Sequence, residues 1–471
     1  MFKNNFRYEI KLLKRSYWLS ILVIGIGFLF AFATYNGTNN VSKRLNDISN
    51  MQGDLHQKDS IMLATLVKIE NGEDVNTPHW RLPTDPMNIG YRHPRLAIMT
   101  PEPLSFIATG QSDMYTHVKR PKAYGNNFAL DYSEMINPVQ LVLGTFDLAF
   151  VIIYILPLFI IAFTFNILSK EKELGTLKLL GSQPISIIKW LVQKMAIRYI
   201  VFTFITILML LVIIAVFNAD VYSGNTHFMS FLLSIAGYIL FWFTLASLVN
   251  IKINDSSKNA FVLIGGWLLI VMILPATINQ IGSTIYPTPS RLKMINEIRW
   301  TKKINAKMQD VILDNFLKDH PELAQENGEE DFGFWHNYFA SEKVMEEKTA
   351  PLLEKYDLQL QKQQNLIRTF KYLSPAILMQ QSLNTIAGTS ERHYNTYKKQ
   401  VFEFSNTWRA YFIPMVFNKE KFTTQDYKKL PQFVYENKVP NYTWFNTCII
   451  LLMSGLIFMV MMSRTVKNNA V

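Results

Sequence analysis

The residues most suited to chemistry lie in a short stretch between two strongly apolar segments, SKEKELGTLKLLGSQP at positions 169–184. The side chains that single it out are two carboxylates, a glycine, a hydroxyl and apolar anchors ending in a proline: Glu171, Glu173, Gly175, Thr176, Leu177, Leu179 and Pro184. Its four leucines are too numerous for a freely solvated loop, so we expect them to lie on lipid or to insert into a partner. The chemistry predicted here is non-covalent docking.

Local signals predict how this stretch is positioned. The charged residues around Glu171 favour a short amphipathic helix, and Gly181 and Pro184 favour a break after it. Residues 186–194 favour a second helix that leads into the next apolar segment.

Motifs for covalent chemistry are missing from the sequence. It has no phosphate-binding Gly-x-x-x-x-Gly-Lys-Ser/Thr loop, no Gly-x-Ser-x-Gly elbow and no His-Glu-x-x-His pair. Its single cysteine, Cys448, cannot form a thiolate metal site alone. We therefore expect no catalytic residue, no metal site and no cofactor site in this chain.

The composition is typical of a membrane protein with sizeable aqueous parts. Hydrophobic residues make up 49% and charged residues 18%, which is too apolar for an ordinary soluble protein and too charged for one buried entirely in lipid. The net charge of +11 has no nucleic-acid-binding motif beside it, and the cations lie next to apolar segments. We expect contact with membrane lipids and no nucleic-acid partner.

Six apolar segments are long enough to cross a bilayer, which takes about 20 residues of helix. They cover residues 16–35, 146–168, 196–217, 228–249, 260–279 and 443–462. Lys and Arg collect before the first segment, between the second and third, between the fourth and fifth, and after the sixth, whereas the connection 218–227 has none. The positive-inside rule then places both termini in the cytoplasm.

This topology divides the remaining residues between the two sides of the membrane. On the cytoplasmic side we expect an interfacial helix, a coupling segment, a loop and a tail: 1–15, 169–195, 250–259 and 463–471. On the other side we expect a first insert, a short loop and a second insert: 36–145, 218–227 and 280–442. As an alternative, the start could be a cleaved secretory signal ending near Ala33, but the apolar segment exceeds the usual core of about 7–15 residues, which favours an uncleaved span.

The two inserts differ in character. The first begins with apolar residues at helical spacing over 41–55, which predicts that span one continues outward as a helix. Prolines from Pro78 to Pro121 then favour an irregular or short-stranded packed region. The second insert is mainly helical, and its clearest helix is predicted to start with Pro351 in the first turn and to run to Phe370. The apolar residues of this helix favour a core-facing stripe over an intermolecular coiled coil.

The pattern Glu-x-Glu-x-Gly-Thr at 171–176, with Leu-Leu-x-x-x-Pro ending at Pro184, resembles the coupling segment of type-2 ABC exporter permeases. The flanking motifs agree: Asn137-Pro138, Gly144-x-Phe146-Asp147-Leu-Ala-Phe150, Pro157-Leu158 and Asn166. Motifs in both inserts extend the likeness over nearly the whole chain, to the subfamily with large extracytoplasmic inserts after spans one and five: Pro101-Glu-Pro103-Leu104, Gly110-Gln-Ser-Asp113, Leu373-Ser-Pro375-Ala376 and Ala387-Gly-Thr389.

The resemblance implies a transport subunit rather than an enzyme, in the inner membrane of a bacterium. The motif would dock on a separate cytoplasmic ABC ATPase dimer that carries the ATP and Mg. Leu177 and Leu179 would be the buried anchors, while Glu171 and Glu173 would meet basic residues of the ATPase or brace nearby helices. A second permease copy or a paralogue would face this chain across the path. The alternative is a hairpin held only by lipid, with its glutamates solvated.

Three residues of the second span are candidates for a path or hinge. Asp147 is the one acidic residue in any predicted span, and an intramembrane ionisable group is a functional candidate. Because it lies near the outer end of the span, it could instead face the positive end of the helix dipole and remain hydrated, which is the simpler interpretation. Pro157 removes a backbone donor and is expected to bend the span. Asn166, near the end of the span, is a candidate by the resemblance.

These inferences combine into one expected architecture and three candidate functions. We expect a mainly α, polytopic membrane protein with six transmembrane helices and a mostly helical extracytoplasmic domain built from the two inserts. Its leading function is the permease subunit of an ATP-driven exporter. The size of the inserts also fits a mechanotransmission device that moves a periplasmic or outer-membrane partner without translocating a solute. The third function is a membrane-anchored scaffold without an ATPase, which the coupling segment argues against.

Overall fold

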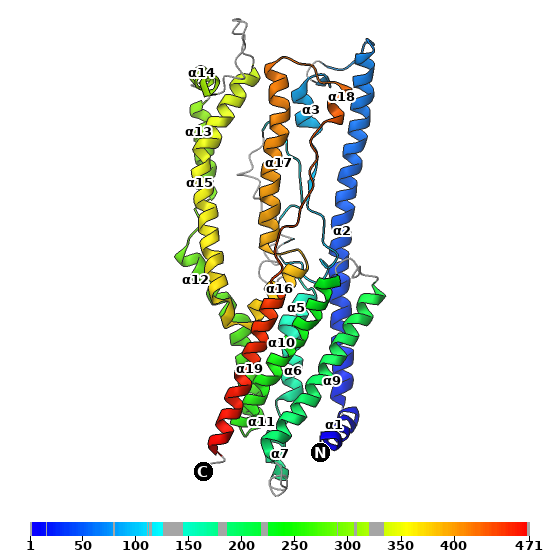
Figure 1. Cartoon of the computed structure of the whole chain (residues 1–471), viewed down its shortest axis with the longest axis vertical. Helices are drawn as coiled ribbons and strands as arrows, with labels where there is room; N and C mark the ends of the chain where they lie inside the picture. Colours follow the sequence, from blue (N-terminus) through cyan, green and yellow to red (C-terminus); the bar gives the residue numbers. More distant parts are fainter. Residues whose placement is uncertain are drawn as a thin grey trace.

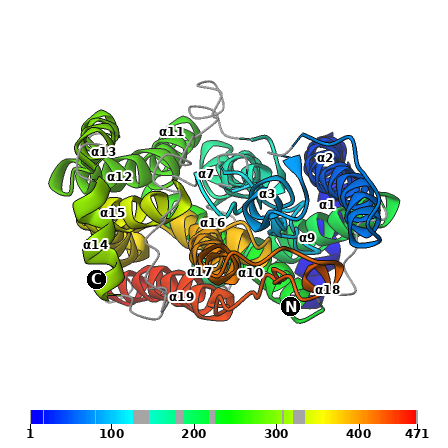
Figure 2. The same cartoon turned by 90° about the horizontal axis from the view of Figure 1, so that it is seen from above.

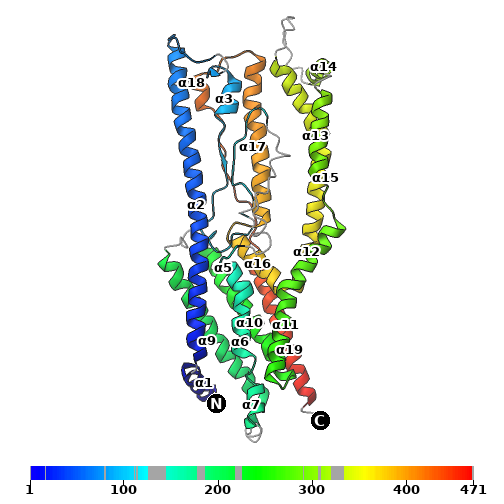
Figure 3. The ribbon, with the colours of Figure 1, turned by 180° about the vertical axis from the view of Figure 1, so that it is seen from behind.

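The computed structural model describes residues 2–15, 17–78, 81–110, 112, 115–125, 145–177, 186–217, 225–289, 291–305, 309–319 and 334–468. These residues form an elongated molecule that is mainly helical, as predicted (Figure 1). A bundle of apolar helices occupies one end and carries both ends of the chain, while two columns of helices rise from it (Figures 1 and 3).

Six helices in the described residues are long and apolar enough to cross a membrane, and each covers one predicted span. They are Leu19–Glu70, Leu148–Glu173, Ile187–Val216, His227–Lys252, Ser256–Ile285 and Thr443–Ser463. The predicted number and order of spans are therefore confirmed as apolar helices. Their ends differ from the predicted ones because a helix need not stop where its apolar run stops. The third begins at Ile187, so the end of the predicted coupling segment belongs to that helix.

The bundle elements follow one another along the chain: α1 (Phe2–Arg15), α2 (Tyr17–Glu70), α5 (Leu148–Phe150), η3 (Val151–Ile155), α6 (Leu156–Thr164), α7 (Ser169–Glu173), α9 (Ile187–Val216), α10 (Asn225–Lys252), α11 (Ser256–Trp267), η5 (Leu268–Ile273), α12 (Leu274–Ile285) and α19 (Thr443–Asn468). The predicted N-terminal helix is present as α1, which packs against α9 and α2. Helix α10 lies centrally and contacts α6, α9 and α19.

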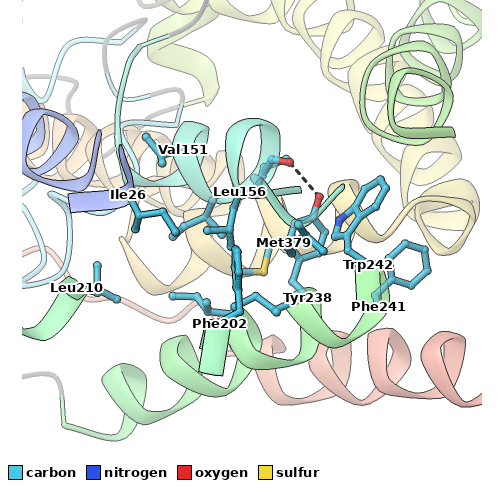
Figure 4. Packing of buried hydrophobic residues seen from close by; sticks show 14 of the residues in the cluster. Ile26, Val151, Leu156, Phe202, Leu210, Tyr238, Phe241, Trp242 and Met379 are labelled. Atoms are coloured by element: carbon cyan, nitrogen blue, oxygen red, sulfur yellow. Dashed lines mark hydrogen bonds between the residues drawn. The ribbon is translucent and has the colours of Figure 1, made fainter. Parts of the chain in front are cut away.

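The core of the bundle is built from large apolar side chains on several spans. Ile26 of α2, Phe202 of α9, and Tyr238 and Trp242 of α10 are almost fully buried together. Figure 4 shows them meeting Met379, which comes from α16 (Pro375–Ile386), a helix outside the six spans. The second insert therefore contributes to the same core as the spans.

Helix α2 links the bundle to the far end of the molecule. Its 54 residues extend about 80 Å at 1.5 Å per residue, well beyond the roughly 30 Å of a bilayer's hydrocarbon. Only its N-terminal part can lie within a membrane. The rest runs along a group of elements that we call the lobe, which includes α3 (Pro86–Arg92), α17 (Glu391–Phe417) and α18 (Thr424–Lys428) (Figures 1 and 3). The predicted continuation of span one as a helix is thus confirmed, whereas the side of the membrane to which it runs stays a prediction.

A π-helical segment, η3, ends two residues before Pro157, and the bend expected at this proline stays a prediction. Pro157 has no N–H to donate to the carbonyl of Ile153, four residues earlier. The hydroxyl of Tyr238 donates to this carbonyl instead, at 3.0 Å (Figure 4). Span five repeats the arrangement, with η5 before Pro275 and the Ser374 hydroxyl donating to a carbonyl of η5.

A second hydrophobic core lies in the lobe away from the spans. It combines Met62 and Leu66 of α2, Met87 of α3 (Pro86–Arg92), and Trp408 and Phe412 of α17 (Glu391–Phe417). The lobe also contains α18 (Thr424–Lys428) and a two-stranded antiparallel ladder, β1 (Ala97–Ile98) with β2 (Val118–Lys119). Residues of both predicted inserts therefore pack around one core, and the short-stranded character predicted for the first is confirmed.

The other column of helices starts from α12 and consists of α13 (Arg291–Asn305), α14 (Gln309–Asp319) and α15 (Phe334–Phe370), which ends in η7 (Lys371–Leu373). Viewed along the long axis, this column and α2 lie on opposite sides of α16 and α17 (Figure 2). The prediction that a helix starts at Pro351 is wrong, because α15 begins 17 residues earlier and Pro351 lies inside it. Packing of Ala340 against Ile312 and Leu313 of α14 stabilises the earlier turns.

Close packing of α2 on the first insert makes Gly37 sensitive to substitution. A Cβ atom at Gly37 would lie 2.1 Å from the backbone oxygen of Phe106, so we expect Gly37→Ala to lower the free energy of unfolding by about 2 kcal/mol. Gly53 on the same helix faces open space, and Gly53→Ala should raise it by about 1 kcal/mol through helix propensity. Thermal unfolding of the full chain, followed by tryptophan fluorescence, measures both. Shifts of equal sign would contradict this packing.

Candidate coupling site

The predicted coupling motif lies at the base of the bundle, at the end opposite the lobe. Helix α7 ends the second span there, at the same end as α1 and both ends of the chain (Figures 1 and 3). The structure describes the motif up to Leu177, whereas Leu179 and Pro184 lie outside the described residues.

The second span unwinds into a turn over residues 165–168, between α6 and α7. Asn250 of α10, which is fully buried, donates to the carbonyl of Thr164 at 3.0 Å and accepts from the N–H of Leu168 at 3.4 Å. Asn259 of α11 donates to the carbonyl of Phe165 at 3.1 Å. These two side chains satisfy the backbone groups that the unwound turn frees and fix α7 beside spans four and five.

Asn166, predicted as a path or hinge residue, lies in this turn. It is half-buried, and its backbone carbonyl accepts from the N–H of Lys170 at 3.1 Å. The structure thus places Asn166 at a break in the helix. Its part in a path or hinge stays a prediction.

Glu173 connects α7 to the start of α11. Its carboxylate accepts from the backbone N–H of Ser256 at 2.8 Å, and the hydroxyls of Ser169 and Ser256 are also 2.8 Å apart. A carboxylate at a helix N-terminus satisfies a free donor and faces the positive end of the dipole. Lys172 adds a hydrogen bond to the side chain of Asn254. A displacement of α7 would therefore also move the start of α11.

Glu171 connects α7 to α9. Its carboxylate accepts from the Thr176 hydroxyl at 2.5 Å and lies 3.5 Å from the ammonium group of Lys194. Both glutamates of the motif thus brace neighbouring helices, which is one of the two roles that the resemblance implies.

Glu9 extends this bonding to α1 and was missed by the sequence reasoning. It is 4% exposed and lies 2.8 Å from Arg198 and 3.9 Å from Lys194. Arg198 also donates to the carbonyl of Phe163 at 2.7 Å. A signal was available, because Glu9 is the only acidic residue of the otherwise basic helix α1. A buried acid on such a helix requires cationic partners.

The end of α7 explains the glycine of the motif. Gly175 has a φ of +72° just after the last helical residue, a left-handed conformation that favours glycine at a helix C-terminus. Leu174 is 65% exposed, whereas Leu177 is half-buried and packs against the bundle core. Leu174 is thus the more exposed of these two leucines, and the role of Leu177 as an anchor in a partner stays a prediction.

Asp147 lies at the opposite end of the second span. It is buried and accepts from the backbone N–H groups of Phe150 and Thr109, each at 2.8 Å. The first bond caps α5 and the second holds the first insert against the span. The carboxylate faces the start of α5, as the simpler interpretation expects, but it is buried in the protein rather than hydrated.

One family model matches part of the chain. Residues 291–436 match the model of a family described as a domain of unknown function (DUF3526). The match covers about a third of the chain and runs from α13 to the segment after α18. A search of curated proteins found no match. The matched stretch lies in the second insert, so the comparison says nothing about the coupling site.

Proposed function

We propose that this chain is the transmembrane permease subunit of an ATP-driven ABC exporter, driven through α7 by a separate cytoplasmic ATPase dimer. The observation that carries the proposal is the bonding of α7. Glu171 and Glu173 tie one short element at the base to α9 and α11. A push on α7 would therefore reach spans three and five together. ATP and Mg would lie on the ATPase, because the sequence lacks a phosphate-binding loop.

The proposed orientation puts the base of the bundle in the cytoplasm of a bacterium and the lobe beyond the inner membrane. Both ends of the chain lie at the base together with α7 (Figures 1 and 3). Helix α1 ends with Lys14 and Arg15, which suits the positive-inside rule. Anionic head groups of the inner leaflet would contact its cationic residues.

The proposed cycle uses the ATPase to change the population of two permease conformations. ATP binding would close the ATPase dimer, and the closed dimer would bind one position of α7 more tightly. The shift in population cannot exceed this difference in binding free energy. The π-helical segments η3 and η5 would be the bending points, because each already departs from the regular hydrogen-bond pattern.

The exposed apolar surface of span five supports a second permease copy or a paralogue as partner. Only 17% of the apolar window within Ser256–Ile285 is buried inside this chain. Gly265 and Gly266 face open space, where a Cβ would meet no atom within 4 Å. Glycines on an apolar helix permit close approach of another helix. The proposed translocation path would run between the two facing copies.

A coupling measurement tests the proposal. The chain is purified from native membranes with the ATPase that accompanies it, and ATP hydrolysis is measured in liposomes. Glu173→Gln removes the charged acceptor at the start of α11, worth about 1 kcal/mol. We expect the stimulation of hydrolysis by this subunit to fall about fivefold, the equivalent of that free energy. Glu354→Gln, at an exposed site on α15, should leave it unchanged.

Two outcomes would overturn the proposal. One is a chain that purifies from native membranes with no ATPase, and the other is full stimulation in the Glu173→Gln variant despite a folded protein. Either outcome would leave the lipid-held hairpin or the membrane-anchored scaffold as the better explanation.

A mechanotransmission device is the second candidate, favoured by the continuity of α2. This single helix joins the bundle core through Ile26 and the lobe core through Leu66, so motion at the base would reach the lobe directly. The partner would be a periplasmic or outer-membrane protein. Movement of a labelled solute into liposomes separates export from mechanotransmission, in which ATP hydrolysis would change lobe distances without solute movement.

A further inference from the structure

The lobe contains a cationic pocket that has no part in the coupling described above. It has a volume of about 470 Å³ and lies between α2, α3 and the three lining residues Thr77, Arg81 and Pro83. These elements meet near the far end of the lobe (Figures 1 and 3). The volume falls within the roughly 300–1,000 Å³ typical of small-molecule sites.

The charges that line the pocket have one sign. Lys58, Arg81 and Arg92 line it beside His93, and none of the described lining residues is an aspartate or a glutamate. Within the described residues, none of the lysine and two arginines forms a salt bridge. Three cations that converge on one concavity repel one another until an anion neutralises them.

Asp59, which follows Lys58 on α2 and bonds to His93, is already used by other partners. Asp59 is 3% exposed and bonds to Arg95 at 2.5 Å, to His93 at 2.9 Å and to the hydroxyl of Tyr427 at 2.8 Å. Because Asp59 holds the Nδ1 atom of His93, it fixes one wall of the pocket. Within the described residues, Lys58, Arg81 and Arg92 form no salt bridge with this carboxylate.

The pocket also has an apolar floor. Met62 and Ile89 line it and are both buried. On α2 the lining residues Lys58, Met62 and Thr65 repeat at helical spacing, so one face of the helix presents a cation, an apolar group and a hydroxyl in turn. The site therefore combines a charged rim with a place for a small apolar group.

We propose that this pocket binds an organic oxyanion, a phosphate or carboxylate carried on a small apolar group. The oxyanion would pair with Arg92, Lys58 and Arg81, since guanidinium and ammonium groups form charge-assisted hydrogen bonds with both oxyanions. The apolar part would lie on Met62 and Ile89. Oxyanions of this kind occur in free metabolites and in the head groups of lipids, and the experiment below distinguishes the two sources.

Calorimetric titration of the full chain in detergent tests the proposal, with hexyl phosphate as the probe. We expect hexyl phosphate to bind more tightly than inorganic phosphate, because the apolar floor contributes, and hexyl glucoside not to bind. Arg92→Gln and Lys58→Gln should each weaken binding about tenfold, as for a lost hydrogen bond to a charged group. Lys43→Gln is the matched control, because Lys43 is exposed on α2 about 22 Å along the helix from Lys58.

Competition identifies the source of the anion. Displacement of hexyl phosphate by phosphatidylglycerol vesicles, but not by phosphatidylcholine vesicles, would assign the head to a lipid, and no displacement would assign it to a free anion. The proposal is overturned if native protein does not bind hexyl phosphate, or if the double variant Lys58→Gln/Arg92→Gln binds it as well as native protein. These titrations need no ATPase, so their outcome is independent of the transport proposal.

Discussion

Asp59→Asn is expected to lower the free energy of unfolding of the lobe by about 3–5 kcal/mol, the usual cost of breaking a buried ion pair by removing one partner. The carboxylate is buried and bonds to Arg95, His93 and Tyr427 at once. Asparagine keeps the shape but leaves the Arg95 guanidinium without a counter-charge. Chemical denaturation of the full chain at neutral pH measures the loss.

The control for this prediction is Asp357→Asn. Asp357 pairs with Lys398 at 3.3 Å, but both side chains are partly exposed, at 45% and 31%. A pair of this kind contributes about 0–1 kcal/mol. Equal losses for the two variants would show that the three partners of Asp59 add nothing to the stability of the lobe.

The same carboxylate predicts a pH dependence. Burial raises the pKa of Asp59, but the hydrogen bonds from His93, Arg95 and Tyr427 outweigh it, and the net pKa lies below 3.8. The unfolded state therefore takes up the proton first as the pH falls. The contribution of Asp59 is fully present above about 3.8 and is lost as the pH falls through the lower folded-state pKa. The Asp59→Asn variant lacks this titrating carboxylate, so its free energy of unfolding should lack this contribution to the pH dependence.

The six spans were predictable because their signal is local. A run of about 20 apolar residues forms a helix in lipid whatever its neighbours are, and each predicted run lies in such a helix. The continuation of span one as a helix beyond its apolar run was also predictable from the periodicity of residues 41–55. The start of α15 was not, because Pro351 is tolerated inside a helix whose earlier turns pack on α14, and that packing involves residues far along the chain.

The candidate site was predictable in location but not in bonding. The residue types at 171–176 identified the stretch, and Gly175 adopts the left-handed φ that a helix C-terminus favours. The partners of Glu173 and Glu171 are 83 and 23 residues away along the chain, and no periodicity encodes such contacts. The exposure of Leu174 and the half-buried position of Leu177 could not be predicted for the same reason, since exposure depends on the fold around each residue.

Helix α1 should detach from the base of the bundle when Glu9 is replaced by glutamine. The buried carboxylate is 2.8 Å from Arg198 of α9 and 3.9 Å from Lys194. Its loss leaves the poorly exposed Arg198 without a counter-charge and leaves Lys194 with Glu171 alone. We expect the chain to lose about 3 kcal/mol of unfolding free energy. Trypsin should also cleave faster at Lys11, Lys14 and Arg15, because an undocked α1 exposes its backbone to the protease.

A second variant separates a direct ion pair from general damage to α1. Removing both charges, as in Glu9→Gln/Arg198→Gln, leaves no uncompensated carboxylate or guanidinium, so part of the lost stability should return. If the double variant is as unstable as the sum of the two single variants, the two groups do not interact. If α1 in the Glu9→Gln variant is cleaved at the native rate, Glu9 does not hold the helix. Recovery in the double variant together with faster cleavage in the single one would identify Glu9 as the link between α1 and the helix that also holds Glu171.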